Sequence, residues 1–542
     1  MESQECGWLL YISLAAKCGG EPYRVVGFVA VLVVAFAVTS LAHWVAPGGP
    51  AWGRYWWNRK GVGIGHAIPG PRGFPVVGSM PLMAGLAHRK LAAAVATAGS
   101  PAWRRLMAFS VGETRVVVTS DPDVARELLA SPAFADRPVK ESAYGMLFHR
   151  AIGFAPYGTY WRALRRVAST HLFSPRQVAA SAAHRAVIAR QMVDAMKSAA
   201  AGAGGGVVQA RQFLKRASLH NVMWSVFGRK YELAAPESEE TAELRSMVEE
   251  GYDLLGQLNW SDHLPWLAPF DLQKTRSRCS SLVPRVTRFV TRIIDDHRAR
   301  LTLAADDFTD VLLSLHGNDK LSDADMVAVL WEMIFRGTDT VAVLIEWIMA
   351  RLVLHQDVQA RVHGELDRVV GPDRAVTESD AANLVYLQAV IKEVLRLHPP
   401  GPLLSWARLA TSDVHVAGFF VPSGTTAMVN MWAITHDPTV WDDPTEFKPE
   451  RFVVRSPDQA TEFPITGSDL RLAPFGSGRR SCPGKSLAIA TVGFWVATLL
   501  HEFEWLPPSD GPRRGVDLSE VLKLSCEMTA PLEARLRPRR AV

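Results

Sequence analysis

The residues best suited to chemistry in this sequence lie close together near the C-terminus, at residues 475–484 (FGSGRRSCPG). Cys482 stands in a glycine-rich loop, and a long apolar run that is typical of a helix follows it. Backbone N–H groups and a helix N-terminus stabilise negative charge, so this position favours a thiolate. Gly478 and Gly484 carry no Cβ and permit close approach to a flat, bulky group, and Arg480 adds a positive charge.

A thiolate, a close backbone approach and an arginine together suit a haem and one of its propionates. Taken alone, Cys482 has an alternative interpretation, because a lone cysteine is usually a small buried apolar residue. The spacing of Phe475, Gly478, Arg480, Cys482 and Gly484 resembles the haem-binding signature of the cytochrome P450 family. The resemblance implies heme b, with the Cys482 thiolate as the proximal ligand of the iron.

A long helix is predicted upstream of this loop. Ser322 and Asp325 form a capping box, and residues 323 to about 355 contain no proline and a single glycine, Gly337. At 1.5 Å per residue the helix spans roughly 45 to 50 Å, enough to cross a whole domain. Its surface is apolar nearly all round, which predicts that it is buried.

This helix carries an acid and a hydroxyl group together, in Asp339 and Thr340. One interpretation is structural: a threonine bonded back to its own helix beside a buried aspartate. The other is proton delivery, with Thr340 donating or relaying a proton and Asp339 resupplying it. Residues 337–340 resemble the oxygen-activation motif of the family. Arg336 and Val341 depart from that motif. These departures affect the prediction of proton delivery more than the prediction that the protein binds haem.

Arg336 lies four residues before Thr340, and therefore on nearly the same face of the helix. Its guanidinium is in a position to hold a substrate carboxylate in the cavity beside the haem. The alternative is an ion pair within the helix, because Glu332 lies four residues earlier and Asp339 three later. The sequence leaves both interpretations open.

Three further residues are assigned to the cofactor by the resemblance. Trp161 and Arg165 are four residues apart, on one helical face. By itself this is a weak pattern that a surface helix explains equally well. The family has a tryptophan and an arginine at this spacing that contact a haem propionate, and Arg408 occupies its further propionate-binding position.

A second capping box, at Thr377, predicts a helix that the prolines at 399–400 end. Glu393 and Arg396 lie three residues apart within it, as an ordinary surface ion pair would. The resemblance implies instead that this pair and Arg451 form a scaffold network of the family. Elsewhere, a hairpin and two short strands around a turn at 422–424 predict small sheets.

The N-terminal region contains a candidate membrane span. Residues 25–42 are eighteen residues without a charge, just long enough for a transmembrane helix. Arg54, Arg59 and Lys60 follow without any acidic residue, which predicts that the C-terminal side lies in the cytosol. A cleaved signal peptide is the alternative, but the length of the run and the tryptophans that follow favour a retained anchor. A proline-rich stretch at 68–75 follows, resembling the hinge of membrane-bound family members.

Length and composition limit the number of domains, the redox compartment and the classes of partner. The 542 residues show no long linker after residue 68, so we expect an anchor and linker at 1–67 and one catalytic domain at 68–542. The five cysteines show no spacing typical of zinc sites or disulfide frameworks, which indicates a reducing compartment. The net charge of +5 comes without a basic and aromatic stripe, so no nucleic-acid partner is expected.

These motifs occur in family order over roughly residues 68 to 540, and residues 259–266 and 335–341 look like the plant KLUH-type group. The resemblance implies a mainly α cytochrome P450 fold with small β-sheets, preceded by one N-terminal transmembrane helix. It further implies a single-pass enzyme of the endoplasmic-reticulum membrane with a cytosolic catalytic domain. NADPH-cytochrome reductase would supply electrons, and the hydrophobic substrate would be a fatty acid or a related lipid that regulates organ growth.

Two rival functions remain open at this stage. A haem-thiolate isomerase or dehydratase acts on a peroxide without a reductase, and such an enzyme does not need the Asp339 and Thr340 pair. A non-enzymatic haem-binding protein is the second rival, since the Cys482 loop by itself does not exclude it. The presence of an acid and a hydroxyl for proton delivery favours a monooxygenase over both.

Overall fold

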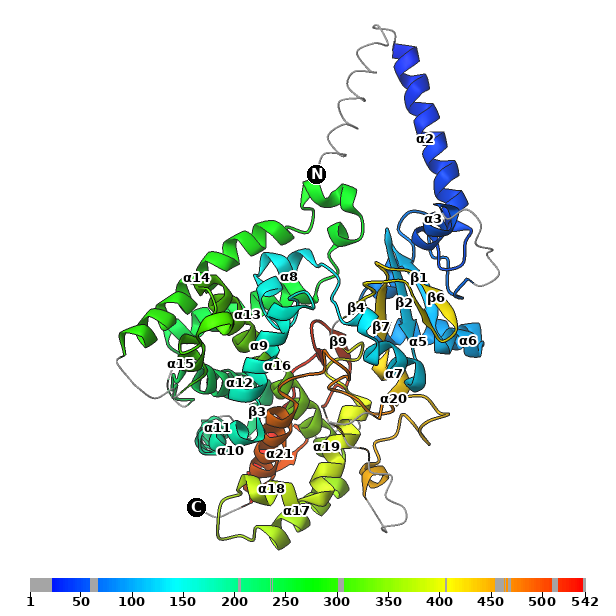
Figure 1. The fold of residues 1–542 in the computed structure, drawn as a ribbon. Coiled ribbons are helices and arrows are strands. Elements are labelled where there is room, and N and C mark those ends of the chain that lie inside the picture. The colour runs from blue at the N-terminus through cyan, green and yellow to red at the C-terminus, as the bar shows by residue number, and fades with distance from the viewer. Residues whose placement is uncertain are drawn as a thin grey trace.

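The computed structural model has a helical body with four small sheets, of which the largest lies to one side, and one helix that projects from it (Figure 1). This architecture confirms the predicted fold class. The structure describes residues 22–58, 67–202, 206–233, 235, 237–300, 307–404, 407–453, 463, 465, 469–508 and 515–539.

The helices of the N-terminal half are α2 (Pro22–Trp44), α3 (Pro50–Asn58), α4 (Met80–Met83), α5 (Ala87–Ala98), α6 (Pro101–Arg105), α7 (Pro122–Ala130), α8 (Glu141–Gly145), α9 (Thr159–His171), α10 (Pro175–Ala180), α11 (Ala182–Gly202), α12 (Ala210–Phe227) and α13 (Glu239–Gly256). Those of the C-terminal half are α14 (Thr275–Ala299), α15 (Phe308–Leu313), α16 (Asp323–Leu354), α17 (Gln356–Val369), α18 (Glu378–Asn383), α19 (Val385–Leu397), α20 (Met431–Thr435) and α21 (Lys485–Glu502). The strands are β1 (Met107–Val111), β2 (Thr114–Thr119), β3 (Val207–Gln209), β4 (Arg408–Leu409), β5 (Val414–Val416), β6 (Phe419–Val421), β7 (Thr426–Val429), β8 (Phe503–Leu506), β9 (Glu520–Leu522), β10 (Cys526–Met528) and β11 (Glu533–Pro538).

Helix α16 is the central element of the body. Its 32 residues begin at the predicted capping box, in which the Ser322 hydroxyl accepts from the Asp325 N–H and the Asp325 carboxylate accepts from the Ser322 N–H. Most of its side chains are buried, and it packs against α12, α14, α19 and α21. The predicted long buried helix is therefore confirmed, and it runs through the middle of the molecule (Figure 1).

The largest sheet has four strands in the order β1-β2-β7-β4, with β2 and β7 parallel and the other pairs antiparallel. The β1–β2 hairpin turns at Gly112, whose φ of +54° is a left-handed conformation that favours glycine. The strands expected around the turn at 422–424 exist, but they do not form one sheet: β5 pairs with β6, whereas β7 joins β2 and β4.

The helix predicted between Thr377 and the prolines at 399–400 is in fact two helices. The capping box at Thr377 is present, but α18 ends at Asn383 and α19 begins at Val385. The N–H groups of Tyr386 and Leu387 donate to the carboxylate of Glu365 on α17, at 2.8 and 3.0 Å. The carboxylate of a neighbouring helix thus accepts hydrogen bonds from the first N–H groups of α19. No local sequence pattern indicates this contact.

The predicted scaffold network is present in the body. Arg396 donates twice to the Glu393 carboxylate, at 2.7 and 2.8 Å, and both side chains are fully buried. Arg451 joins the same carboxylate at 3.2 Å. Arg396 also donates to the backbone carbonyls of Thr435 and Pro444, so the pair connects α19 to the end of α20 and to the loop that follows it.

The N-terminal helix α2 stands clear of the body (Figure 1). Its segment Val26–Trp44 has a mean hydropathy of 2.2, none of it is buried, and its length suffices to cross a membrane. After it, α3 packs against β1, with Trp52 among the most buried large side chains. The folded body therefore extends to the N-terminal side of residue 68.

Candidate active site

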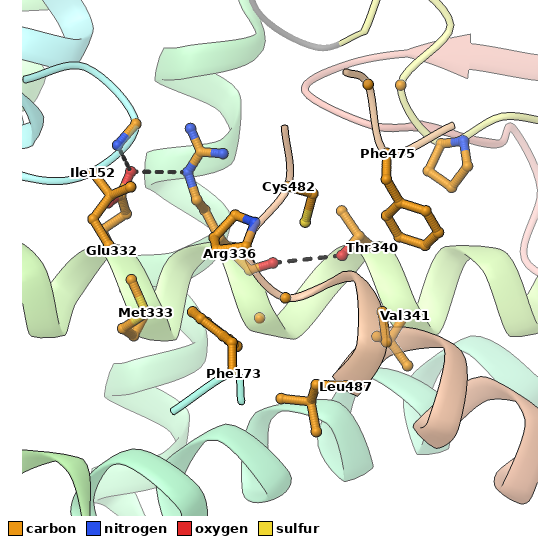
Figure 2. A pocket seen from close by; sticks show the side chains of 18 of the residues that line it. Ile152, Phe173, Glu332, Met333, Arg336, Thr340, Val341, Phe475, Cys482 and Leu487 are labelled. Atoms are coloured by element: carbon orange, nitrogen blue, oxygen red, sulfur yellow. Dashed lines mark hydrogen bonds and ion pairs between the residues drawn. The ribbon is translucent and has the colours of Figure 1, made fainter. Parts of the chain in front are cut away.

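A cavity of about 310 Å³ lies between α16 and the loop that precedes α21. Cys482 and Phe475 from the loop and Arg336 and Thr340 from α16 all line it, as Figure 2 shows. The rest of the lining is mostly apolar and includes Ile152, Phe173, Val222, Met333, Val341, Leu344, Leu395 and Leu487. Its volume and lining are those of a small-molecule or cofactor site.

The Cys482 loop is held by its own backbone. The N–H of Cys482 donates to the carbonyl of Phe475 at 2.9 Å, and the N–H of Ser481 donates to the carbonyl of Gly478 at 3.1 Å. Gly478 has a φ of +71°, and a Cβ there would lie 2.0 Å from the Leu129 carbonyl oxygen on α7. The close approach at Gly478 is thus to the protein itself, and it fixes where the loop sits.

Gly484 lies directly before α21 and lines the cavity. A Cβ at this position would be 3.2 Å from the ring of Phe173, so a side chain would press on that ring. Cys482 precedes Gly484 by two residues, at the edge where α21 begins. This arrangement presents the sulfur and the first turn of α21 to the same cavity.

The protonation of Cys482 does not follow from the loop alone. Burial raises the pKa of the Cys482 thiol, although a hydrogen bond from the Gly484 N–H and the nearby Arg336 and Arg165 act to lower it. The sequence predicted that Cys482 favours the thiolate form. Burial has the opposite effect on its pKa, and burial cannot be seen in the sequence. A bound metal cation selects the thiolate form. Among the cysteines that the structure describes, Cys279 and Cys526 do not line the cavity.

Positive charge is concentrated around the cavity. Its described lining contains five arginines, Arg137, Arg165, Arg336, Arg408 and Arg480, against a single acidic residue, Glu332. Burial and the charge of Arg480 lower the pKa of Arg408 to about 9, and burial lowers the pKa of Arg480 to about 10. Guanidinium groups stay protonated near neutral pH even so. This surplus suits a ligand with two carboxylates, as the haem propionates are, so the residues present fit a haem.

The arginines predicted to bind propionates are held by backbone carbonyls. Arg480 donates to Ala135, Ile152 and Ala155, at 2.9, 3.1 and 2.7 Å, and its guanidinium lies 4.3 Å from the Trp161 ring centroid. Arg165, on α9 with Trp161, donates to Ser481 at 2.8 Å, and Arg408 donates to Ser477 at 3.4 Å. Trp161 donates to Ile152 at 2.8 Å. All four line the cavity, so the structure brings these distant motifs together.

Arg137 also belongs to the site, although no sequence pattern predicted it. This buried side chain lines the cavity and donates to the carbonyls of Gly153 and Ala407, at 3.3 and 3.0 Å. Burial and then the charges of Arg408, Arg480 and Arg336 lower its pKa well below the usual value. No periodicity or spacing marks this arginine, and only the fold brings it to the others.

Thr340 and Asp339 lie on different sides of α16. Thr340 is exposed to the cavity, and its hydroxyl donates a long hydrogen bond of 3.5 Å back to the Arg336 carbonyl of its own helix (Figure 2). Asp339 does not line the cavity; its carboxylate forms a 2.9 Å ion pair with Lys215 on α12. Burial raises the pKa of Asp339, and Lys215 acts to lower it.

Arg336 forms the ion pair that the sequence analysis considered. Its Nε lies 3.0 Å from Glu332 Oε1, and the same oxygen accepts from the N–H of Gly153 at 2.8 Å (Figure 2). Glu332 is 1% exposed, whereas 34% of the Arg336 side chain is exposed at the cavity. Arg336 therefore forms an ion pair with a buried carboxylate of its own helix. The same carboxylate binds the N–H of Gly153, so it holds a loop that is distant in sequence at the edge of the cavity.

The fold and this site are those of a haem-thiolate oxidoreductase. The sequence model of the family described as Cytochrome P450 matches residues 68–525, and the chain belongs to this family. Cytochrome P450 78A9 of Arabidopsis thaliana is 64% identical over 503 residues, covering 93% of this chain and 92% of its own. Cytochrome P450 78A6 of the same plant is 60% identical, covering 98% of each chain. Flavonoid 3',5'-hydroxylase CYP75B138 of Crocosmia x crocosmiiflora is 33% identical, covering 87% of this chain and 91% of its own.

Membership settles the class of reaction and the cofactor. The protein is a monooxygenase of the cytochrome P450 family, and this family binds heme b through a cysteine thiolate. Members generally take electrons from a redox partner and act on hydrophobic substrates. The predicted family, fold and enzyme class are confirmed.

Proposed function

We propose that this protein is a membrane-anchored monooxygenase that inserts one oxygen atom into a fatty acid or a related growth-regulating lipid. Electrons would come from NADPH through a flavin reductase, and α2 would hold the catalytic domain on the cytosolic side of the endoplasmic reticulum. The observation that carries the proposal is the cavity, where a cysteine, an apolar lining and a surplus of arginines meet the Thr340 hydroxyl. Because the arginines are assigned to the propionates and to Glu332, it is the apolar part of the lining that suits a lipid chain.

Each residue around the cavity has a distinct role in this proposal. Cys482 would hold the iron, and Arg137, Arg165, Arg408, Arg480 and Trp161 would bind the propionates. The haem, when bound, supplies the activation of dioxygen and the transfer of one oxygen atom. Thr340 would donate or relay a proton at the cavity, and Asp339 would resupply it from behind the helix.

The position of Thr340 is what favours oxygen insertion over peroxide rearrangement. Both Thr338 and Thr340 donate back to the helix, to the carbonyls of Ile334 at 2.7 Å and Arg336 at 3.5 Å, but of the two threonines it is Thr340, with the longer bond, that lines the cavity. A rearrangement needs no proton donor at this place. The relative named flavonoid 3',5'-hydroxylase is a hydroxylase by its name, which agrees with oxygen insertion.

The experiment is a product search with the full-length protein. The protein is incubated with reductase, NADPH and a plant lipid extract, and in parallel with lauric acid and methyl laurate. We expect products heavier by one oxygen atom that require both NADPH and reductase. Because Arg336 is paired with Glu332, we expect Arg336→Ala to affect the acid and the ester to a similar extent. Turnover of a peroxide without reductase, and of no other substrate, would contradict the proposal.

A further inference from the structure

Residues 152–155 form a buried loop that several cavity residues share. The loop lies between the 3-10 helix η3 (Phe148–Arg150) and α9. Its backbone carbonyls accept hydrogen bonds from Arg480 and Trp161 at Ile152, from Arg137 at Gly153, and from Arg480 again at Ala155. Three of the side chains assigned to the propionates are therefore placed by this one loop.

A single carboxylate of α16 holds the loop from the other side. The Gly153 N–H donates to Glu332 Oε1 at 2.8 Å, and Arg336 Nε lies 3.0 Å from the same oxygen (Figure 2). Burial raises the pKa of Glu332, whereas Arg336 and the N–H groups of Gly153 and Ile152 act to lower it. Arg336 thus stabilises the charged form of the group that binds the loop.

The loop has a glycine at the point of contact, and the ion pair is the reason. A Cβ on Gly153 would lie 2.2 Å from Glu332 Oε1 and 2.4 Å from Arg336 Nη2. The φ of Gly153 is outside the left-handed region, so its backbone conformation does not require a glycine. The position needs a glycine because the two side chains of α16 fill the space that a methyl group would take.

The pair contributes position to the cavity and not net charge. The negative charge of Glu332 opposes the positive charge of Arg336 at 3.0 Å. Apart from this pair, the described lining still contains four arginines and no acid. Those four suffice to attract two propionates, so the pair is not needed for attraction.

We propose that Glu332 and Arg336 are positioning residues for the haem, which hold the 152–155 loop so that Arg137, Arg480 and Trp161 are in place for the propionates. This inference rests on the propionate contacts put forward under the proposed function. A site whose contacts are fixed in advance loses less conformational freedom when its ligand binds. Loosening the loop should therefore let haem leave faster, with no change in the iron ligand.

The test measures how fast the full-length, haem-loaded protein releases haem to an excess of apomyoglobin. The main variant is Glu332→Ala/Arg336→Ala, which removes both members of the pair and leaves neither charge unpaired. We expect release to be about tenfold faster, because groups that orient the direct contacts of a ligand act on this scale. Gly153→Ala should give a similar rise, since its methyl group displaces the pair. Adding Gly153→Ala to the double variant should give no further rise.

The matched control is Arg211→Ala. Arg211 on α12 pairs at 2.8 Å with Glu346 of α16, which is 1% exposed, as Glu332 is, but neither Arg211 nor Glu346 lines the cavity. This variant should lose stability in thermal unfolding and still release haem at the parent rate. The reduced, carbon-monoxide-bound spectrum should be that of the parent in every variant, because Cys482 is unchanged.

Three results would overturn the proposal: release from the double variant at the parent rate, an equal rise in Arg211→Ala, or rises that multiply when Gly153→Ala is added. If the double variant does not fold, Glu332→Gln replaces it. This change removes the charge that Arg336 binds and should give a smaller rise, and an unchanged rate would again overturn the proposal. Arg480→Ala is measured separately. If it does not speed release, the propionate assignment of the proposed function fails, whatever the pair does.

Discussion

The two sides of the cavity differ in how their functional groups are held. On one side, the 475–484 loop positions Cys482 through its own backbone, with the Cys482 N–H on Phe475 and the Ser481 N–H on Gly478. On the other side, the groups of α16 take their positions from partners far away in the sequence. Lys215 holds Asp339, and Gly153 binds the carboxylate of Glu332. A short motif therefore defines the internal shape of the loop, whereas tertiary contacts hold the functional groups of α16.

The consequence is clearest at Asp339 and Thr340. Successive residues of an α-helix point about 100° apart, which allows one of two neighbours to face the cavity while the other faces away. Thr340 faces it, and Asp339 faces α12 and Lys215. On the loop side, the expected iron ligand is a single residue, Cys482. On the helix side, the hydroxyl at the cavity and the acid behind it are two residues with different surroundings, so each can be changed by mutation without the other.

The largest effect is expected on the loop side, at Cys482. Replacement by histidine removes the thiolate, which pushes electron density towards bound oxygen, so we expect monooxygenase activity to fall about a thousandfold or more. The absorption spectrum of the reduced, carbon-monoxide-bound protein reports the ligand directly. Cys526→Ala is the control, because this cysteine is buried but does not line the cavity. An unchanged spectrum in Cys482→His would show that another residue binds the iron.

A smaller effect is expected at Thr340, on the helix side. Thr340→Ala removes the hydroxyl at the cavity and leaves the apolar lining in place, so product formed per NADPH should fall about tenfold while peroxide rises. Substrate binding should change little. Thr338→Ala is a matched control two residues away, since that hydroxyl is bonded to Ile334 and does not line the cavity. Equal coupling in the parent and in Thr340→Ala would exclude the donor role.

The smallest effect concerns Lys215, which acts through Asp339. Lys215→Met leaves a buried carboxylate without its cation, so we expect a loss of about 1 to 3 kcal/mol in the free energy of unfolding at neutral pH. Burial acts to lower the pKa of Lys215, but Asp339 and Glu527 outweigh it and raise that pKa. The stability from this pair is present below the ordinary lysine pKa and is lost as pH rises through the raised one.

Denaturant unfolding of both proteins across neutral and alkaline pH measures this difference. The gap between the parent and Lys215→Met should close as pH rises through the raised lysine pKa. Lys215→Arg keeps the charge and should keep the stability at neutral pH. A gap that stays constant with pH would mean that Lys215 contributes by packing and not by its charge.

The sequence by itself determined the elements whose hydrogen bonds are local. The capping box of Ser322 and Asp325 defines the start of α16, and the glycine at 112 defines the turn between β1 and β2. The internal hydrogen bonds of the Cys482 loop belong to the same class, because they span fewer than ten residues along the chain, whereas its contacts with Leu129 and Arg165 do not. Such features can be predicted from residue types and spacing because both partners of each hydrogen bond lie within one short stretch of sequence.

Only the tertiary structure decided the rest. The Glu365 carboxylate that starts α19 comes from another helix, and Arg137 reaches the cavity without any pattern that marks it. Asp339, the residue predicted to resupply protons, pairs with Lys215 and does not line the cavity, and Trp52 attaches to the sheet a segment that composition assigned to a linker. In each case the partner lies tens or hundreds of residues away, so the contact exists only after the chain has packed. Local propensity and spacing contain no information on which distant group that will be.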